Sequence, residues 1–375
     1  MPRSDKPATP VGRGVVRIDL DAIAHNLDLL RQRCEPAGTM AIVKADAYGH
    51  GAIPVARRLA QAGAQSFGIA FLTEGIALRS AGIQEPILVL GPTLPGEPPG
   101  YRDHGLTPTI SSLDQLELWD AWTRSEGVVQ DVHLKVDSGM SRLGVPLEAV
   151  SPALDGIRTA PGLRLTGFLS HLAEADRPEN RGNERQMQRF AHALELLTTT
   201  ERDSVVIHLA NSGAAKYLPD SRHQMVRLGI ALFGVDPTRK ASDLRPAMTV
   251  ASRVNALRNI SAGTHVGYGS TWTAERETTL AVVPVGYGDG YPWRLSNRGS
   301  VLVGGRAYPI VGRVSMDMTV IDTTDGEVGL GDEAVLLGTQ GEAALSAWDL
   351  AEAAETMAWE VLCAFGLRLP RDYVG

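Results

Sequence analysis

The chain has 375 residues, of which 43% are hydrophobic and 21% charged, which is the balance of a folded globular protein long enough for two domains. Its 36 basic and 43 acidic residues give a formal net charge of -7, so the charge pattern offers no footprint for nucleic acid or for anionic lipid. The two cysteines, Cys34 and Cys363, match no metal-ligand or redox spacing, and we expect reduced thiols and no metal site.

The N-terminus lacks the apolar core of a signal peptide, and no run reaches the roughly 18 apolar residues that span a bilayer. We therefore expect a cytoplasmic protein that binds neither a membrane nor nucleic acid.

Short β-rich runs recur through the first two thirds of the chain, after a predicted strand at 15–18 and a predicted helix at 19–31. Amphipathic stretches with helical spacing separate most of them, as at 54–62 and 184–197. Eight apolar strands alternating with helices fit a closed TIM-type (β/α)₈ barrel, with an open doubly wound sheet as the alternative. We assign the barrel to residues 13–242. The eight predicted strands are 40–44, 67–71, 87–91, 106–110, 132–136, 163–170, 205–209 and 225–230.

The pattern changes after Asp236 and Pro237. Short β-branched runs at 248–254, 279–285, 300–303 and 319–322 are separated by Gly, Asp and Asn turns, and the first long helical pattern begins at 347. We predict a mostly β domain over residues 243–375. The fold class is therefore α/β, with an N-terminal barrel followed by a β-rich domain.

Polar side chains gather at the carboxyl ends of the predicted barrel strands, where barrels of this type carry function. Ser212 opens the segment after the seventh strand, and Gly229 and Ile230 end the eighth, where many barrels bind phosphate through backbone N–H groups. The alternative is that "RLGI" is only a tight exit from the strand.

Lys44 ends the first apolar strand, in "AIVKADAYGHG". A buried ammonium must be paired or used chemically, because an unpaired buried charge costs several kcal/mol. A lone strand-end lysine is more often a salt-bridge partner. A lysine and a phosphate loop on the same rim instead favour a Schiff base between Lys44 and pyridoxal phosphate.

Seven motifs, in this order, resemble those of the alanine racemases, which are fold-type III pyridoxal phosphate enzymes, over nearly the whole chain. The resemblance implies a homodimer with shared active sites that interconverts L-alanine and D-alanine, and so supplies D-alanine for peptidoglycan. The motifs are "AIVKADAYGHG", "KVDSGMSRLG", "HLANSGA", "VRLGIALFG", "VGYGSTW", "VGYGDG" and "VGRVSMD".

The resemblance also assigns roles to residues. Lys44 would hold the cofactor and handle the α-proton of the D-enantiomer, while Tyr268 of the partner subunit would act on the opposite face. Arg227 would hydrogen-bond the pyridine nitrogen and leave it without a proton, because guanidinium does not act as an acid near neutral pH. Lys135 would be carbamylated and would orient Arg142. The remaining assignments are Tyr48, His171, Asn211, Ser212, Gly229 and Ile230 at the cofactor, Arg142, Met316 and Asp317 at the substrate, and Tyr287 in the access corridor.

One departure lies near the C-terminus, where some relatives place a phosphate-binding tyrosine and this chain has Leu367. It leaves open a racemase of serine or of another small amino acid. A non-catalytic pyridoxal phosphate-binding protein of cofactor homeostasis is another alternative, although such proteins lack a β domain. A decarboxylase of the same fold type is disfavoured by Arg227.

Overall fold

The computed structural model describes residues 13–240 and 243–375, and the chain forms two compact units. One unit spans Asp21–Arg245, and the other combines the segment that ends at Leu20 with Pro246–Gly375. Strand β1 (Gly14–Asp19) therefore belongs with the C-terminal unit, whereas the range 13–242 expected for the barrel includes it. The reason is pairing, because β1 is hydrogen-bonded to strands of the C-terminal half.

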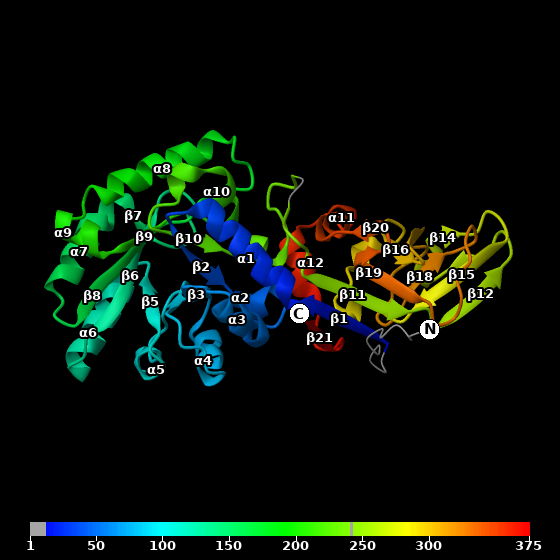
Figure 1. Cartoon of the computed structure of the whole chain (residues 1–375), viewed down its shortest axis with the longest axis horizontal. Helices are drawn as coiled ribbons and strands as arrows, with labels where there is room; N and C mark the ends of the chain where they lie inside the picture. Colours follow the sequence, from blue (N-terminus) through cyan, green and yellow to red (C-terminus); the bar gives the residue numbers. More distant parts are fainter. Residues whose placement is uncertain (1–12, 241–242) are drawn as a thin grey trace, which may run out of the picture. The chain divides into compact units, whose positions relative to one another are not determined.

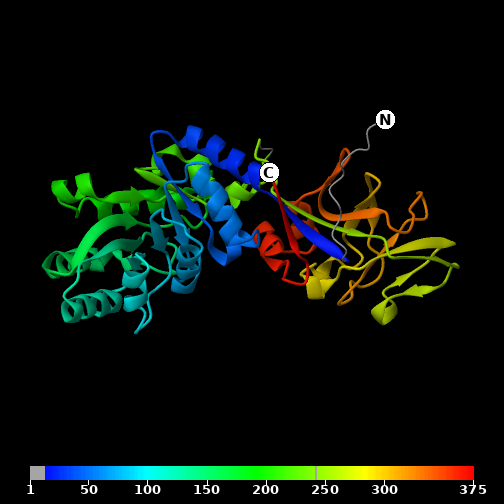
Figure 2. The same cartoon turned by 60° about the horizontal axis from the view of Figure 1, so that its bottom comes forward.

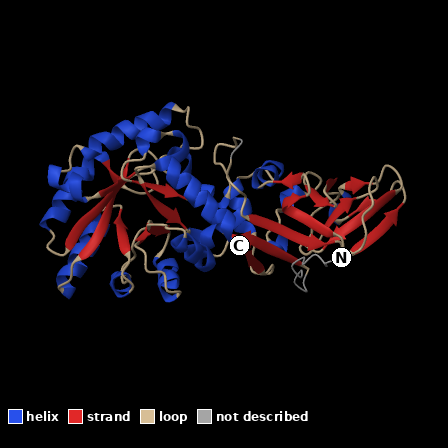
Figure 3. Cartoon of the chain, in the orientation of Figure 1, coloured by secondary structure: helices blue, strands red, loops and turns tan. Residues whose placement is uncertain are grey.

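The first unit is a nearly closed barrel of parallel strands with helices on its outside (Figures 1 and 3). In the part of the chain that the structure describes, eight strands follow one another in the hydrogen-bonded order β10-β2-β3-β4-β5-β6-β8-β9. Two backbone bonds join the last strand to the first, from Gln224 N–H to Ile207 O (3.1 Å) and from Arg227 N–H to Ala210 O (2.9 Å). The predicted barrel is confirmed, and the open sheet is excluded.

The barrel strands match the eight predicted runs within a few residues. They are buried on both faces, as the interior and the helical layer require, so they read as continuous apolar runs. Their bounds are β2 (Gly38–Ile42), β3 (Ser66–Ile69), β4 (Ile87–Val89), β5 (Thr107–Ile110), β6 (Gln130–Asp137), β8 (Leu163–Leu169), β9 (Val206–His208) and β10 (Met225–Leu228), and β7 (Val145–Pro146) pairs beside β6.

The helices bury one apolar face against the barrel, as Val55, Ala56 and Leu59 of α3 illustrate. Ser112 caps α6 by accepting a hydrogen bond from the N–H of Gln115. The helices are α1 (Leu20–Cys34), α3 (Ala52–Gln61), α4 (Leu72–Ser80), α5 (Pro98–Asp103), α6 (Leu113–Glu126), α7 (Val150–Thr159), α8 (Arg181–Leu194), α9 (Thr199–Ser204) and α10 (Ser212–Tyr217), with short 3₁₀ turns at Leu147–Ala149, Pro219–Ser221 and Ile230–Phe233.

The second unit is built on a sheet in the order β17-β16-β19-β11-β1-β21, with β20 paired to β19. Strand β1 lies between β11, to which it is antiparallel, and β21, to which it is parallel (Figures 1 and 2). The first and last strands of the described chain are thus neighbours in one sheet. The strands are β11 (Met248–Arg253), β16 (Ser300–Val303), β17 (Arg306–Pro309), β19 (Glu333–Gln340), β20 (Ala343–Leu345) and β21 (Arg371–Val374).

A smaller sheet, β12-β15-β18, and the pair β13-β14 complete this unit, together with helices α11 (Ala347–Ala353) and α12 (Ala358–Ala364). The predicted runs 248–254, 279–285, 300–303 and 319–322 are confirmed as β11, β15, β16 and β18. Among the residues that the structure describes, no helix combines the length and apolarity that a membrane crossing requires. The further bounds are β12 (Ala256–Ile260), β13 (His265–Val266), β14 (Trp272–Thr273), β15 (Thr278–Val283) and β18 (Thr319–Asp322).

Candidate active site

Lys44 opens a left-handed turn at the barrel rim, directly after strand β2. This turn, α2 (Lys44–Tyr48), is not a right-handed helix, because Ala45, Asp46 and Ala47 have φ of 52°, 53° and 53°, and Tyr48 has φ of 54°. This hand costs roughly 1–2 kcal/mol per L-residue and persists only where the surroundings impose it. The sequence run was expected to continue as a strand through Lys44; instead the strand ends at Ile42 and strained backbone begins.

Tyr48 and the exit of β10 form a cradle for an anion. A Cβ atom on Gly229 would lie 2.5 Å from the Tyr48 hydroxyl oxygen, so only glycine leaves room for the phenol. The Ser212 hydroxyl accepts hydrogen bonds from the N–H groups of Gly229 (2.8 Å) and Ala231 (3.4 Å). Ile230 is buried beside them. Hydroxyl, phenol and backbone N–H groups that converge in this way suit a phosphate.

Asn211 fixes the segment that leads into this cradle. Its side-chain oxygen accepts a hydrogen bond from the N–H of Ala214 (3.2 Å) and caps α10, and its amide donates to Leu172 O (3.4 Å). The structure therefore gives Asn211 a supporting position between the loops after β8 and β9.

Arg227 is 97% buried in β10, and its guanidinium is held by groups at the carboxyl ends of β8 and β9. It donates to the carbonyl oxygens of Ser170 (2.6 Å), His208 (2.8 Å) and Leu209 (3.0 Å). It also contacts Nδ1 of His208 at 2.9 Å and Nδ1 of His171 at 3.1 Å. Burial lowers the pKa of Arg227 to about 10, which still leaves it charged near neutral pH. The hydrogen bonds therefore hold the cationic guanidinium of Arg227 in one orientation within the site.

The imidazoles around Arg227 are neutral. Burial, followed by the charge of Arg227, holds the pKa of His171 and of His208 well below the usual histidine value. His208 Nε2 in turn contacts Nδ1 of His133 at 3.0 Å, and burial lowers the pKa of His133 to about 4. The sequence reasoning missed His133 and His208. The available signal was their place inside apolar strands, with His133 two residues before Lys135 and thus on the same face of β6.

Lys135 is almost completely buried among positive charges. Burial lowers the pKa of Lys135 to about 8, and the charges of Arg227, Arg142 and Lys44 act in the same direction against Asp137. The carboxylate of Asp137 is engaged by the N–H groups of the loop 139–141, at 2.9–3.1 Å. Arg142 follows this loop at the surface. The structure thus brings Lys44, Lys135, Arg142, His171 and Arg227 into one electrostatic neighbourhood.

The other predicted site residues lie in the second unit, on exposed loops. Tyr268 is 74% exposed at the start of the 3₁₀ turn Tyr268–Ser270, and Tyr287 and Met316 are also exposed. The loop of Tyr268 rests on Arg313, whose guanidinium carbon would lie 3.1 Å from a Cβ atom on Gly269. Leu367, at the position of the departure, is 93% exposed.

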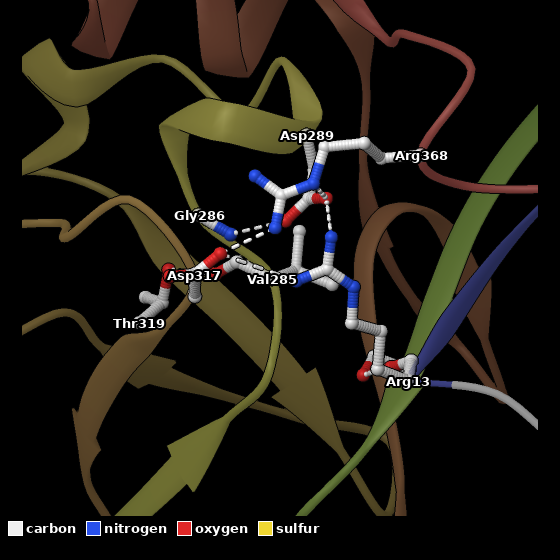
Figure 4. Close-up of polar contacts among 8 residues, drawn as sticks. Arg13, Val285, Gly286, Asp289, Asp317, Thr319 and Arg368 are labelled. Carbon is white, nitrogen blue, oxygen red and sulfur yellow. Dashed lines mark hydrogen bonds and ion pairs between the residues drawn. The ribbon is translucent and has the colours of Figure 1, made fainter.

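Asp317 belongs to an ion-pair network that joins four chain segments (Figure 4). Fully buried Asp289 pairs with Arg13 at 2.5 Å and lies 3.4 Å from Arg368. Both arginines also contact Asp317. The second carboxylate oxygen of Asp289 accepts a hydrogen bond from the N–H of Gly286 (3.0 Å). The sequence reasoning missed Arg13, Asp289 and Arg368, since nothing local marks residues whose partners lie between 51 and 304 positions away.

The network supports the two loops that carry exposed site residues. Tyr287 N–H donates to Ser315 O (3.0 Å), and Gly288 N–H donates to Met316 O (2.9 Å), so the loops pair directly. The ion pairs then connect this paired edge to the segments of Arg13 and Arg368. Tyr287, Met316 and Asp317 are therefore held on one supported edge.

The barrel residues fit one organic cofactor well. An amine at the rim suits an aldehyde, the cradle of Tyr48, Ser212 and Gly229 suits a phosphate, and the buried guanidinium of Arg227 suits a ring nitrogen that accepts a hydrogen bond. Aldehyde, phosphate and ring nitrogen are three of the four polar groups of pyridoxal phosphate, the fourth being its phenolic hydroxyl.

Comparisons with known proteins agree over nearly the whole chain. Residues 18–237 match the family model "Alanine racemase, N-terminal domain", and residues 247–373 match "Alanine racemase, C-terminal domain". The alanine racemase of Mycolicibacterium vanbaalenii is 44% identical over 371 residues, which cover 96% of this chain and 94% of that protein. The solved alanine racemase of D-cycloserine-producing Streptomyces lavendulae is 36% identical, with a TM-score of 0.90 and 98% of both chains covered. That of Bartonella henselae, solved with covalently bound pyridoxal phosphate, is 31% identical, with a TM-score of 0.90 and 96% of this chain and 99% of that chain covered.

Proposed function

Because the chain belongs to the alanine racemase family and is a pyridoxal phosphate-dependent racemase of alanine, we propose that Lys44 and Tyr268 of the partner subunit exchange the α-proton from opposite faces of the substrate. The observation that carries the proposal is the position of Lys44 at the rim, on the same turn as Tyr48 of the anion cradle and in the electrostatic neighbourhood of Arg227. The product D-alanine would serve peptidoglycan synthesis.

The side chains of the barrel would bind and orient the cofactor. When bound, pyridoxal phosphate withdraws electrons from the α-carbon and makes its proton more acidic. Tyr48, Ser212, Gly229 and Ile230 would hold its phosphate. Arg227 would donate a hydrogen bond to the ring nitrogen without giving up its proton, which would limit electron withdrawal by the ring and favour return of the proton to the α-carbon.

Racemisation requires proton transfer on both faces of the α-carbon. The Lys44 amine serves one face, and a phenol serves the other. An ordinary phenol has a pKa near 10, so Tyr268 needs cationic or hydrogen-bonding neighbours in the assembled site. His171 and Arg142 are the residues we assign to this role. Arg142 also faces the substrate carboxylate, and Met316 and Asp317 of the partner subunit line the mouth.

Shared sites require a homodimer, and exposed apolar side chains support one. Tyr268, Tyr287, Trp293, Met316 and Met318 are all exposed in the second unit. Phe71 and Leu94, which follow β3 and β4, are both 60% exposed at the carboxyl ends of the barrel strands. Large exposed apolar side chains of this kind mark interaction surfaces. We propose that the second unit of each subunit covers the rim of the partner's barrel, and that the dimer is cytoplasmic.

Replacement of the lysine tests the assignment of Lys44. Lys44→Ala should abolish racemase activity and the visible absorbance of bound cofactor, because it removes the amine that we assign to the aldehyde. Lys240→Ala is the matched control, since Lys240 lies over the ring of Tyr217 outside the site, and it should keep both signals. Retention of wild-type absorbance by Lys44→Ala would refute the assignment. The racemase assay on the wild type, which has Leu367, with L-serine beside L-alanine measures how far the substrate range extends beyond alanine.

A further inference from the structure

Glu74 joins two neighbouring loops at the barrel rim. It lies in the first turn of α4, and one carboxylate oxygen accepts hydrogen bonds from the N–H groups of Ala70 (2.7 Å) and Phe71 (3.1 Å). The other oxygen accepts a hydrogen bond from the N–H of Ala45 (2.7 Å). Ala45 is the residue that follows Lys44, and it belongs to the loop after the adjacent strand β2.

Helix capping accounts for only half of this geometry. An acidic residue at the third helical position commonly reaches back to the N–H of the capping residue, as Glu74 does to Phe71. The bond to Ala45 contributes nothing to α4. It connects the carboxylate to the left-handed turn. Because the acceptor is charged, this hydrogen bond is stronger than one between neutral groups.

The left-handed turn needs such bonds because its backbone is intrinsically unfavourable. Nδ1 of His50 contacts the carbonyl oxygens of Ala47 and Tyr48, both at 3.0 Å, and so secures the distal end. Asp46 accepts a hydrogen bond from the N–H of Ala52 (2.7 Å), which ties the middle to α3. At the end next to Lys44, Glu74 supplies the side-chain anchor.

We propose that Glu74 is a positioning residue for Lys44, an inference that rests on the function proposed above for that lysine. The bond to Ala45 sets the direction of the peptide plane between residues 44 and 45. It thereby fixes the backbone from which the Lys44 amine extends. Through the same turn, Glu74 also keeps Tyr48 over Gly229 at the anion cradle.

Glu74→Asp separates this role from helix capping. The chain itself shows that aspartate can cap from the same position, since Asp349 accepts a hydrogen bond from Ser346 N–H at 2.7 Å and Asp289 accepts one from Gly286 N–H at 3.0 Å. Because the aspartate side chain is one methylene shorter, it should keep the cap of α4 and lose the hydrogen bond from the N–H of Ala45. Glu201→Asp is the matched control, because Glu201 caps α9 from Thr198 N–H (2.8 Å) and its carboxylate otherwise pairs with Arg158 of α7.

Three measurements should change together in Glu74→Asp. In the cofactor-free protein, amide exchange of the peptide 44–49 should accelerate roughly tenfold or more, as expected for loss of one charge-assisted hydrogen bond. Cofactor affinity, measured by titration, should fall by about ten- to a hundredfold, and kcat should fall with little change in the KM for alanine. Glu201→Asp should match the wild type in all three.

The outcomes distinguish this inference from the proposed function. Borohydride reduction followed by mass spectrometry reports whether Lys44 of each protein carries the pyridoxyl group. If the wild type carries none, the function proposed for Lys44 fails. If wild type and Glu74→Asp are labelled equally and also agree in exchange and affinity, Glu74 has no positioning role. Should Glu74→Asp not fold, Glu74→Ala, which keeps no acceptor oxygen, replaces it, and wild-type exchange and affinity in that variant would overturn the inference.

Discussion

Lys135 is expected to carry a carbamate, and its surroundings explain why. An amine must be uncharged to add to carbon dioxide. With its pKa lowered to about 8, roughly a quarter of Lys135 is uncharged at pH 7.5, against about one in a thousand for a lysine of ordinary pKa. The reactive fraction is therefore about two hundred times larger than at a surface lysine.

The same charges that lower the pKa also stabilise the product. Addition of carbon dioxide forms a nitrogen–carbon bond, releases a proton to water and leaves a carboxylate on the side chain. The repulsion of Lys135 by Arg227, Arg142 and Lys44 then becomes attraction. A carbamate here would orient Arg142 towards the substrate.

Isotope labelling measures the modification directly. Protein dialysed free of carbon dioxide and then given ¹³C-bicarbonate should gain a carbamate resonance that is absent from Lys135→Ala and unchanged in Lys216→Ala, where the lysine pairs with Asp236. Racemase activity should rise with the resonance. Because protonation competes with carbamylation, the signal should weaken as the pH falls from 8 to 6. Absence of the resonance from wild-type protein at saturating bicarbonate above pH 8 would refute the reasoning.

Two further predictions concern the second unit. Tyr268→Phe should slow exchange of the α-proton of L-alanine far more than that of D-alanine, and equal losses would contradict the two-base scheme. Heterodimers of one Tyr268→Phe subunit and one Lys44→Ala subunit should recover about half the activity of the wild type, because one of the two shared sites is then intact. Asp289→Asn should lower the free energy of unfolding by about 2–4 kcal/mol, since it removes the buried charge between two arginines that retain some hydration. Urea unfolding measures this, with exposed Asp325→Asn as the control and an unchanged midpoint for Asp289→Asn as the contrary result.

The barrel and its reactive rim could be predicted from the sequence for a local reason. Strands alternating with helices form a parallel sheet, and the carboxyl ends of such strands meet at one edge. Polar residues at or near the strand ends, such as Lys44, Ser212 and Arg227, can therefore be expected to lie close together from the sequence alone. The motif order then supplied the family, including the exposed Tyr268, whose role no periodicity could indicate.

Only the tertiary structure decided the features that depend on partners distant in the chain or on the hand of the backbone. The pairing of β1 with β11 and β21, which moves it out of the barrel unit, and the network of Arg13 with Asp289 each join segments that no local period links. The left-handed turn after Lys44 contains alanines that ordinarily favour the opposite hand, so its geometry comes from the anchors Glu74 and His50. Sequence patterns indicate which face of an element is apolar. Hydrogen bonds between distant segments are defined only by the tertiary structure, because folding must first bring both partners together.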